Sequence, residues 1–333
     1  MTPQISVIIP TYKRPATLLQ TLDSLQSQTF DGFDIIVVDN AADHDVECRI
    51  SQFNTAARVP VRHIAEPRAG VMFARHTGAR ASTADLLVFA DDDVICMLGL
   101  IAAYAKAFQD HPDMAAAGGP MLLKWDAPPP AWLVEFIDHA RLFPILGFID
   151  LYDEFHLGPK GVFFSGSMAI RRNALFEVGG FNPELVGDSY IGDGEVGLYR
   201  KLWERRLLIG YVPDALVYHH VPAERMTIEF FRRRMANEGT ADVYTLYHGG
   251  APTRLRLLRH AAGITARNTR CWMKARLCRG RTDKPSVQVQ IDAARTQSQL
   301  KNVLRLIVDS DRRALVARRD WLNTTSGPRR GNL

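Results

Sequence analysis

Short apolar runs alternate with segments of helical period along the first third of the chain. Continuous β-branched and other apolar residues predict buried strands at 5–9, 34–39, 59–65 and 85–90. Apolar residues at a helical spacing predict helices at 18–28, 70–81 and 98–109. Strands that alternate with helices are typical of βαβ units, so we expect an α/β fold with a mainly parallel sheet flanked by helices.

The remainder of the chain is less regular. Three prolines predict a loop or lid at 124–132, and a strand is expected at 161–170. A glycine-rich acidic loop at 187–197 opens a helix, and short strands follow at 208–212 and 215–218. From Thr227 onward the pattern is helical. We therefore expect an α/β domain at 1–225 and a basic helical region at 226–333.

Charge is distributed unevenly between these two parts. Residues 251–333 carry 19 Lys and Arg against 5 Asp and Glu, whereas residues 1–250 carry 22 against 31. This basic region predicts an anionic partner, either a membrane surface or a lipid-phosphate acceptor. A helical bundle with solvated arginines is an equal alternative. A nucleic-acid partner is not expected, because no known binding module is recognisable.

The overall composition indicates a globular protein, with 47% hydrophobic and 23% charged residues in 333. No run of about 18 apolar residues predicts a membrane span, and the first residues do not resemble a signal peptide. Four scattered cysteines suit reduced thiols. We expect a cytoplasmic protein, which can lie peripherally on the inner face of the cell membrane. The sequence does not fix the oligomeric state.

Polar clusters follow three of the predicted strands. They lie at 10–14, at Asp39 and Asn40, and at 91–93. Ligands of parallel α/β sheets bind beyond the carboxyl ends of the strands. The three clusters therefore predict one binding site at one edge of the sheet.

Asp91, Asp92 and Asp93 are the strongest element of this site. Carboxylates that lie this close together repel one another unless a cation joins them, and Mg²⁺ or Mn²⁺ prefers such oxygen ligands. A metal there would neutralise charge on a departing diphosphate. A solvated acidic turn or a helix cap is the alternative.

The other candidates are weaker as single features. Asp39 and Asn40 could bind a base or ribose, or form an Asx turn. Tyr12 could stack on a base and Arg14 could reach a phosphate. Further candidates for the nucleotide sugar are the arginines and glycines near a helix start and a close backbone approach in the later strand: Arg68, Gly70, Arg75, Gly166 and Ser167.

Two carboxylates and a histidine in the second half complete the set. Asp193 or Glu195 could act as a general base, or could cap a helix. His219 could bind a metal or a diphosphate, whereas a structural role is favoured for His220.

Taken in order, these segments resemble the family 2 glycosyltransferases of GT-A fold, which act in bacterial polysaccharide synthesis. The resemblance covers about 5–241 and rests on seven segments: VIIPTYKR at 7–14, IIVVDN at 35–40, EPRAGVMFARHTGA at 66–79, LVFADDDV at 87–94, GSMAIRRNALFEVGGFNPEL at 166–185, GDGEVGLYRKL at 192–202 and PDALVYHHVPAER at 213–225.

The resemblance implies an inverting, metal-dependent transfer of a sugar from a nucleoside diphosphate, UDP by default, to an acceptor hydroxyl. It implies polysaccharide or glycolipid assembly with an acceptor glycan that can be lipid-linked. Asp91, Asp93 and His219 would hold Mn²⁺ or Mg²⁺, and Asp39 the base. Asp193 would be the general base, or Glu195 if the alignment shifts by two residues. The implied donor site also includes Pro10, Thr11, Tyr12, Arg14, Asn40, Arg68, Gly70, Arg75, Asp92, Gly166 and Ser167.

Two other functions remain open at this point. A catalytically silent scaffold at a membrane could keep the same fold, although it would not need clustered carboxylates. A nucleotidylyltransferase would require a glycine-rich loop after the first strand, and residues 10–14 contain no glycine.

Overall fold

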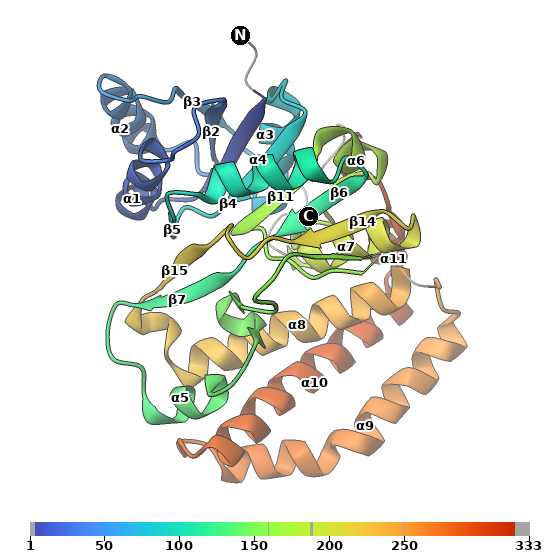
Figure 1. The fold of residues 1–333 in the computed structure, drawn as a ribbon. Helices are drawn as coiled ribbons and strands as arrows, with labels where there is room; N and C mark the ends of the chain where they lie inside the picture. The colour runs from blue at the N-terminus through green and yellow to red at the C-terminus, as the bar shows by residue number, and fades with distance from the viewer. Residues whose placement is uncertain (1–3, 159, 187–188, 249, 324–333) are drawn as a thin grey trace.

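Eight strands form the central sheet in the order β10-β14-β6-β11-β4-β1-β2-β3 (Figure 1). The computed structural model describes residues 4–158, 160–186, 189–248 and 250–323. Strands β4, β1, β2 and β3 are parallel, and β14 is parallel to β6. Strand β11 runs antiparallel to both neighbours, and β10 is antiparallel to β14. The expected sheet flanked by helices is confirmed.

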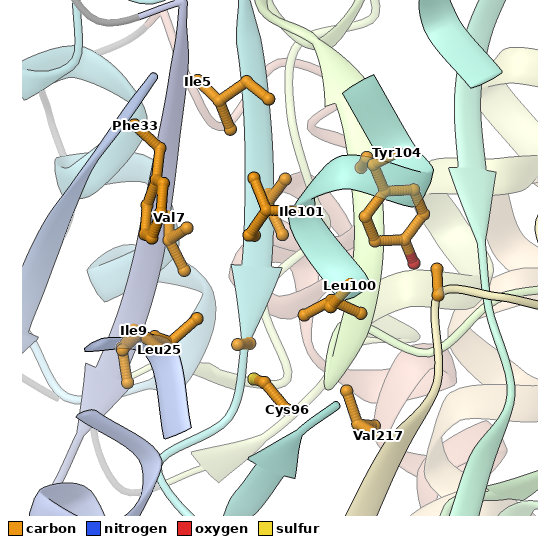
Figure 2. Packing of buried hydrophobic residues seen from close by; sticks show 14 of the residues in the cluster. Ile5, Val7, Ile9, Leu25, Phe33, Cys96, Leu100, Ile101, Tyr104 and Val217 are labelled. Atoms are coloured by element: carbon orange, nitrogen blue, oxygen red, sulfur yellow. The ribbon is translucent and has the colours of Figure 1, made fainter. Parts of the chain in front are cut away.

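The strands and helices predicted in the first third of the chain are largely confirmed. The strands are β1 (Ile5–Thr11), β2 (Phe33–Asp39), β3 (Val61–Ala65) and β4 (Leu86–Ala90). The predicted helices correspond to α1 (Pro15–Gln26), α3 (Val71–Ala81) and α4 (Leu100–Asp110), whereas α2 (His44–Asn54) was not predicted. Residues of β1, β2, α4 and the start of β15 belong to one buried apolar cluster, part of which Figure 2 shows.

The remaining sheet strands depart more from the expectations. They are β6 (Met114–Gly118), β10 (His156–Gly158), β11 (Ser167–Arg171) and β14 (Leu208–Tyr211). The strand expected at 161–170 therefore begins only at Ser167. Phe163 leaves the sheet plane and packs on Gly118, where an added Cβ would lie 2.4 Å from Phe163 Cβ. The expected loop at 124–132 is shorter, because β7 (Met121–Trp125) and α5 (Ala131–Ile137) occupy its ends.

A second sheet extends the edge of the first and has the order β5-β15-β7-β9-β8. Its other members are β5 (Val94–Cys96), β8 (Leu142–Phe143), β9 (Phe148–Ile149) and β15 (Val217–Val221). Strand β15 is longer than expected and includes both histidines. Its antiparallel pairing with β5 places His219 opposite Val94, directly beside the acidic cluster.

Several short elements connect the sheets to the last helices. They are η1 (Pro144–Leu146), α6 (Arg172–Glu177), β12 (Leu185–Val186), β13 (Ser189–Tyr190), α7 (Gly194–Glu204) and η2 (Ala223–Arg225). Helix α7 begins within the glycine-rich segment expected at 187–197, whose first two residues lie outside the described residues.

Four helices end the described chain: α8 (Ile228–His248), α9 (Arg254–Leu277), α10 (Lys284–Val308) and α11 (Ser310–Ala317). Helix α10 packs against both α8 and α9, so that α9 is the outermost helix (Figure 1). Arg295 of α10 forms a bidentate ion pair with Asp242 of α8, with both N–O distances 2.7 Å. No helix in the described ranges is both long and apolar enough to span a bilayer.

Gly119 joins the two sheets at a point with no room for a side chain. A Cβ on this residue would lie 2.1 Å from the carbonyl oxygen of Ala215. We expect Gly119→Ala to lower the free energy of unfolding by about 1–3 kcal/mol or more, because backbone must move. Gly263→Ala, inside α9, is the control and is expected to raise it by about 0.5–1 kcal/mol. Urea unfolding measures both, and an unchanged midpoint for Gly119→Ala would contradict the packing.

Candidate active site

The acidic cluster lies at the carboxyl edge of the central sheet, where β4 and β1 end side by side. The Thr11 hydroxyl at the end of β1 donates to Asp92 Oδ2 at 2.7 Å. Arg14 contacts both Asp92 and Asp93 at 2.7 Å. The third cluster meets the first through the backbone, because the Asn40 N–H donates to the Thr11 carbonyl at 2.9 Å. All three predicted polar clusters therefore meet at one edge, where neighbouring parallel strands end.

Asp92 lies beneath this edge and is fully buried. Burial raises the pKa of its carboxyl to about 7, although the positive charge of Arg14 acts in the opposite direction. Its hydrogen bond with Thr11 ties β4 to β1. Asp92 therefore supports the strand ends rather than facing the cleft.

Asp93 faces the cleft and is surrounded by positive groups. Arg225 from η2 donates to its Oδ2 at 2.8 Å, beside the contact from Arg14. Burial alone would raise the pKa of Asp93, but the charges of Arg225 and Arg14, which both donate to the carboxylate, hold that pKa well below its ordinary value. The carboxylate is therefore ionised at neutral pH.

His219 presents one nitrogen lone pair to the same point. Its Nε2 lies 3.5 Å from Asp93 Oδ1. Arg225 can only donate, and its Nη1 lies 2.9 Å from that Nε2, so Nε2 is the acceptor. Nδ1 then donates to the Leu146 carbonyl at 2.8 Å. This is the tautomer in which a metal-binding histidine is usually fixed.

Arg75 connects the acidic cluster with helix α7. It is buried, and it donates to Asp91 Oδ1 at 2.7 Å while lying 3.6 Å from Glu195 Oε1. The backbone N–H of Ser165 donates to Glu195 at 3.2 Å, and the Ser165 hydroxyl donates to the same oxygen. The backbone at Gly166 lies close to the acidic cluster, because a Cβ there would lie 3.1 Å from Asp91 Oδ2.

Asp193 lies two residues earlier and is engaged differently. Its Oδ1 accepts from Asn182 at 2.8 Å, and its Oδ2 accepts from the Thr245 hydroxyl at 2.6 Å. The side chain is buried, and it occupies the N-cap position of α7 without capping the helix. One carboxylate oxygen thus binds Thr245 of α8, and the other binds Asn182 in the segment before β12.

One cleft of about 650 Å³ collects most of these groups. Asp91, Asp93, His219, Asp193 and Glu195 all line it, and Arg75 brings Asp91 and Glu195 close together. Helix α8 adds Phe230, Arg233, Arg234, Asn237 and Glu238 to the lining. The lining of the cleft therefore combines carboxylates with several arginines.

The predicted nucleobase side has mostly internal contacts. Asp39 is buried and accepts from the backbone N–H groups of Ala41 and Asp43 at 2.8 and 2.5 Å, which is the Asx-type alternative. Asn40 donates to the carbonyls of Glu66 and Arg68. Neither residue belongs to the lining of the cleft.

The remaining candidates divide between structural contacts and the surface. Arg68 forms a bidentate pair with Glu66, with distances of 2.9 and 2.6 Å. Gly70 has a φ of 127°, which favours glycine, and it begins α3. Ser167 is buried and donates to the Ala215 carbonyl. Pro10 is buried in β1, whereas Tyr12 is 46% exposed beside the loop.

Three residues that contact the candidate groups were missed by the sequence interpretation. Arg225 contacts both Asp93 and His219, Ser165 contacts Glu195, and Thr245 contacts Asp193. Arg225 lies within one of the quoted segments, so its charge beside the histidine pair was the available signal. Ser165 and Thr245 carry no comparable signal, because their roles depend on the tertiary packing of α7.

The predicted metal ligands come together only in part. Asp93 and His219 lie side by side, whereas Asp91 is turned toward Arg75. Accordingly, no group of three such ligands that could hold a metal occurs among the described residues. Two acceptors that face each other at 3.5 Å still fit a Mg²⁺ or Mn²⁺ ion that takes its remaining ligands from substrate phosphates.

The fold is of the GT-A type. The model of the family "Glycosyl transferase family 2" matches residues 6–180, which is more than half of the chain. The chain therefore belongs to glycosyl transferase family 2.

Individual relatives are distant. The chain is 22% identical over 206 residues to a glucosyl-dolichyl phosphate glucuronosyltransferase of Haloferax volcanii, covering 61% of this chain and 64% of that protein. It is 35% identical over 110 residues to an uncharacterized glycosyltransferase of Haemophilus influenzae, covering 33% and 36%. The chain thus spans less than two thirds of the length of these relatives.

A solved structure covers more of the fold. The mannosyltransferase of Pyrobaculum calidifontis, in complex with GDP-Man and Mn²⁺, superposes with a TM-score of 0.54 at 18% identity. The match covers 95% of this chain and 79% of that protein. At this identity the similarity concerns the fold.

Proposed function

We propose that this protein is an inverting, metal-dependent glycosyltransferase that moves a sugar from a nucleoside diphosphate to an acceptor hydroxyl. The observation that carries the proposal is one cleft lined by Asp93 and His219, which face each other, and by Glu195. Asp93 and His219 would hold the metal, which when bound neutralises charge on the diphosphate. Arg14 and Arg225 fix Asp93 in position and add positive charge where the diphosphate would lie.

The general base of this reaction is best assigned to Glu195. In a single displacement the acceptor oxygen attacks the anomeric carbon, its proton passes to the base, and the nucleoside diphosphate leaves. Glu195 is partly exposed, with 23% of its side chain accessible, and it lines the same cleft as the acidic cluster. Asp193, favoured from the family resemblance, has both oxygens engaged by Asn182 and Thr245. We assign it a positioning role.

Family membership argues against a nucleotidylyltransferase, and the intact cleft argues against a silent scaffold. A scaffold would have no need to hold Asp93 ionised beneath two arginines, since burying such charges costs stability. We further propose that the acceptor is a glycan of polysaccharide or glycolipid assembly, which a lipid can carry. The enzyme would then act peripherally on the cytoplasmic face of a membrane, and the basic charge of residues 251–333 supports this location.

A thermal-shift screen of nucleoside diphosphates tests the donor assignment. We expect UDP, GDP or dTDP to raise Tm by about 5 °C at a hundredfold excess over its Kd, but only when Mn²⁺ or Mg²⁺ is present. Nucleoside monophosphates are the control, because they lack the second phosphate. Equal stabilisation with and without metal would refute the metal-dependent site.

A further inference from the structure

The outer face of helix α9 carries an apolar stripe that no part of the described chain covers. Leu255, Leu258, Met273 and Leu277 are 57%, 50%, 55% and 82% exposed. Ala262 and Ala266 are exposed between them. The steps of three, four or seven residues place all six on one side of the helix. We call these six residues the α9 outer stripe.

The stripe lies opposite the face that holds α9 in the fold. Leu257, Ala261 and Ile264 are buried against neighbouring helices, and Trp272 Nε1 donates to Thr296 of α10 at 2.7 Å. These contacts already anchor the helix. The α9 outer stripe therefore takes no part in the contacts that hold α9 in the fold. It extends along a helix of 24 residues, or about 36 Å.

The charges of α9 are all positive. The helix contains seven Arg and Lys and no Asp or Glu. Within the described ranges, none of these seven lies within 4.0 Å of a carboxylate. Arg259 and Arg270 lie along one edge of the stripe and Arg276 along the other, as the helical spacing requires.

We propose that the α9 outer stripe docks on an anionic lipid bilayer. An amphipathic helix with leucines on one face and flanking arginines lies in the plane of a membrane interface, with the apolar side chains at the acyl boundary and the cations among the phosphates. The inference deepens the proposed peripheral location and rests on it. It adds the specific face and the residues that make the contact.

Charge complementarity selects the bilayer over a second copy of the chain. Two copies related by a twofold axis would bring stripe against stripe and arginines against arginines, with no acidic residue on α9 to pair with them. A polyanion without an apolar phase would leave the leucines in water. Only an anionic surface with an apolar interior can contact both the apolar side chains of the α9 outer stripe and the arginines beside it.

Vesicle flotation without substrate tests the docking separately from catalysis. We expect the full chain to partition at least about tenfold better to mixed phosphatidylcholine and phosphatidylglycerol vesicles than to pure phosphatidylcholine vesicles. Leu255→Ser with Leu258→Ser should weaken that partitioning about tenfold. Leu304→Ser is the matched control, because Leu304 of α10 is similarly exposed at 46% but lies outside the stripe.

A second pair of variants separates charge from apolar contact. Arg259→Gln with Arg270→Gln should remove most of the preference for the anionic vesicles. Equal partitioning of the wild type and the double serine variant would overturn the proposal. So would a dimer in sedimentation velocity that the double serine variant abolishes, since the stripe would then bind a second copy. Because nucleotide binding is not part of the measurement, an inactive protein that still floats would refute only the catalytic proposal.

Discussion

Changing Glu195 to glutamine is expected to lower kcat for sugar transfer by about 10²- to 10⁴-fold. The amide keeps the size of the side chain and can still accept from Ser165, but it cannot take the proton of the acceptor hydroxyl. Binding of the nucleoside diphosphate should change little, because the metal and diphosphate are assigned to Asp93 and His219 rather than to Glu195. Steady-state kinetics with a separate titration of nucleotide binding measure both effects.

Asp193→Asn is the matched control, two residues away on the same turn. Its amide would replace an oxygen that accepts from Thr245 or Asn182, so the expected loss is about 1–3 kcal/mol of stability. We expect kcat of the folded protein to fall less than about tenfold. The opposite result, an inactive Asp193→Asn with an unchanged Tm beside an active Glu195→Gln, would return the role of base to Asp193.

The meeting of polar residues at one edge of the sheet could be predicted from the sequence, because the order of the parallel strands places their ends side by side. Strands β1 and β4 are parallel neighbours, so Thr11 and Asp92 meet simply by ending their strands. The same reasoning places Asp39 beside Thr11 across the β1–β2 pair. Which way Asp39 points could not be predicted, because an Asx turn and an open nucleobase contact start from the same residues.

Helix α7 illustrates which part of the site could not be predicted from the sequence, namely the choice between Asp193 and Glu195 as the base. Asp193 is the N-cap residue of α7 and Glu195 lies in its first turn, and both line the cleft. Which of the two is better suited as the base depends on its partners, and Asn182 and Thr245 engage both carboxylate oxygens of Asp193. Those partners lie 11 and 52 residues away, and local sequence contains no signal for them.

The roles of the two histidines of β15 also depend on tertiary structure, and comparing them provides a test of the metal site. Successive residues of a strand point to opposite faces. His219 faces Asp93, whereas His220 Nδ1 lies 3.1 Å from Asp126 Oδ1 on the other side. The sequence favoured a structural role for His220, and the family resemblance implied a site role for His219; the pairing of β15 with β5 supplies the physical reason.

We expect His219→Ala to weaken Mn²⁺-dependent binding of the nucleoside diphosphate by about tenfold to a hundredfold or more. The variant removes the neutral nitrogen that Leu146 and Arg225 hold toward Asp93. The stabilisation that requires both metal and nucleotide should disappear with it. Titration of Mn²⁺ at saturating nucleotide, followed by calorimetry, measures the effect directly.

His220→Ala provides the control, because it alters the same strand by the same number of atoms. Its loss removes only the contact with Asp126, so metal-dependent binding should remain within about twofold of the wild type. Asp93→Asn should behave like His219→Ala, because a neutral amide is a far weaker ligand for a hard cation than a carboxylate. If both histidine variants bound Mn²⁺ and nucleotide equally well, the metal would have to be held elsewhere, and the face of β15 toward Asp93 would be structural.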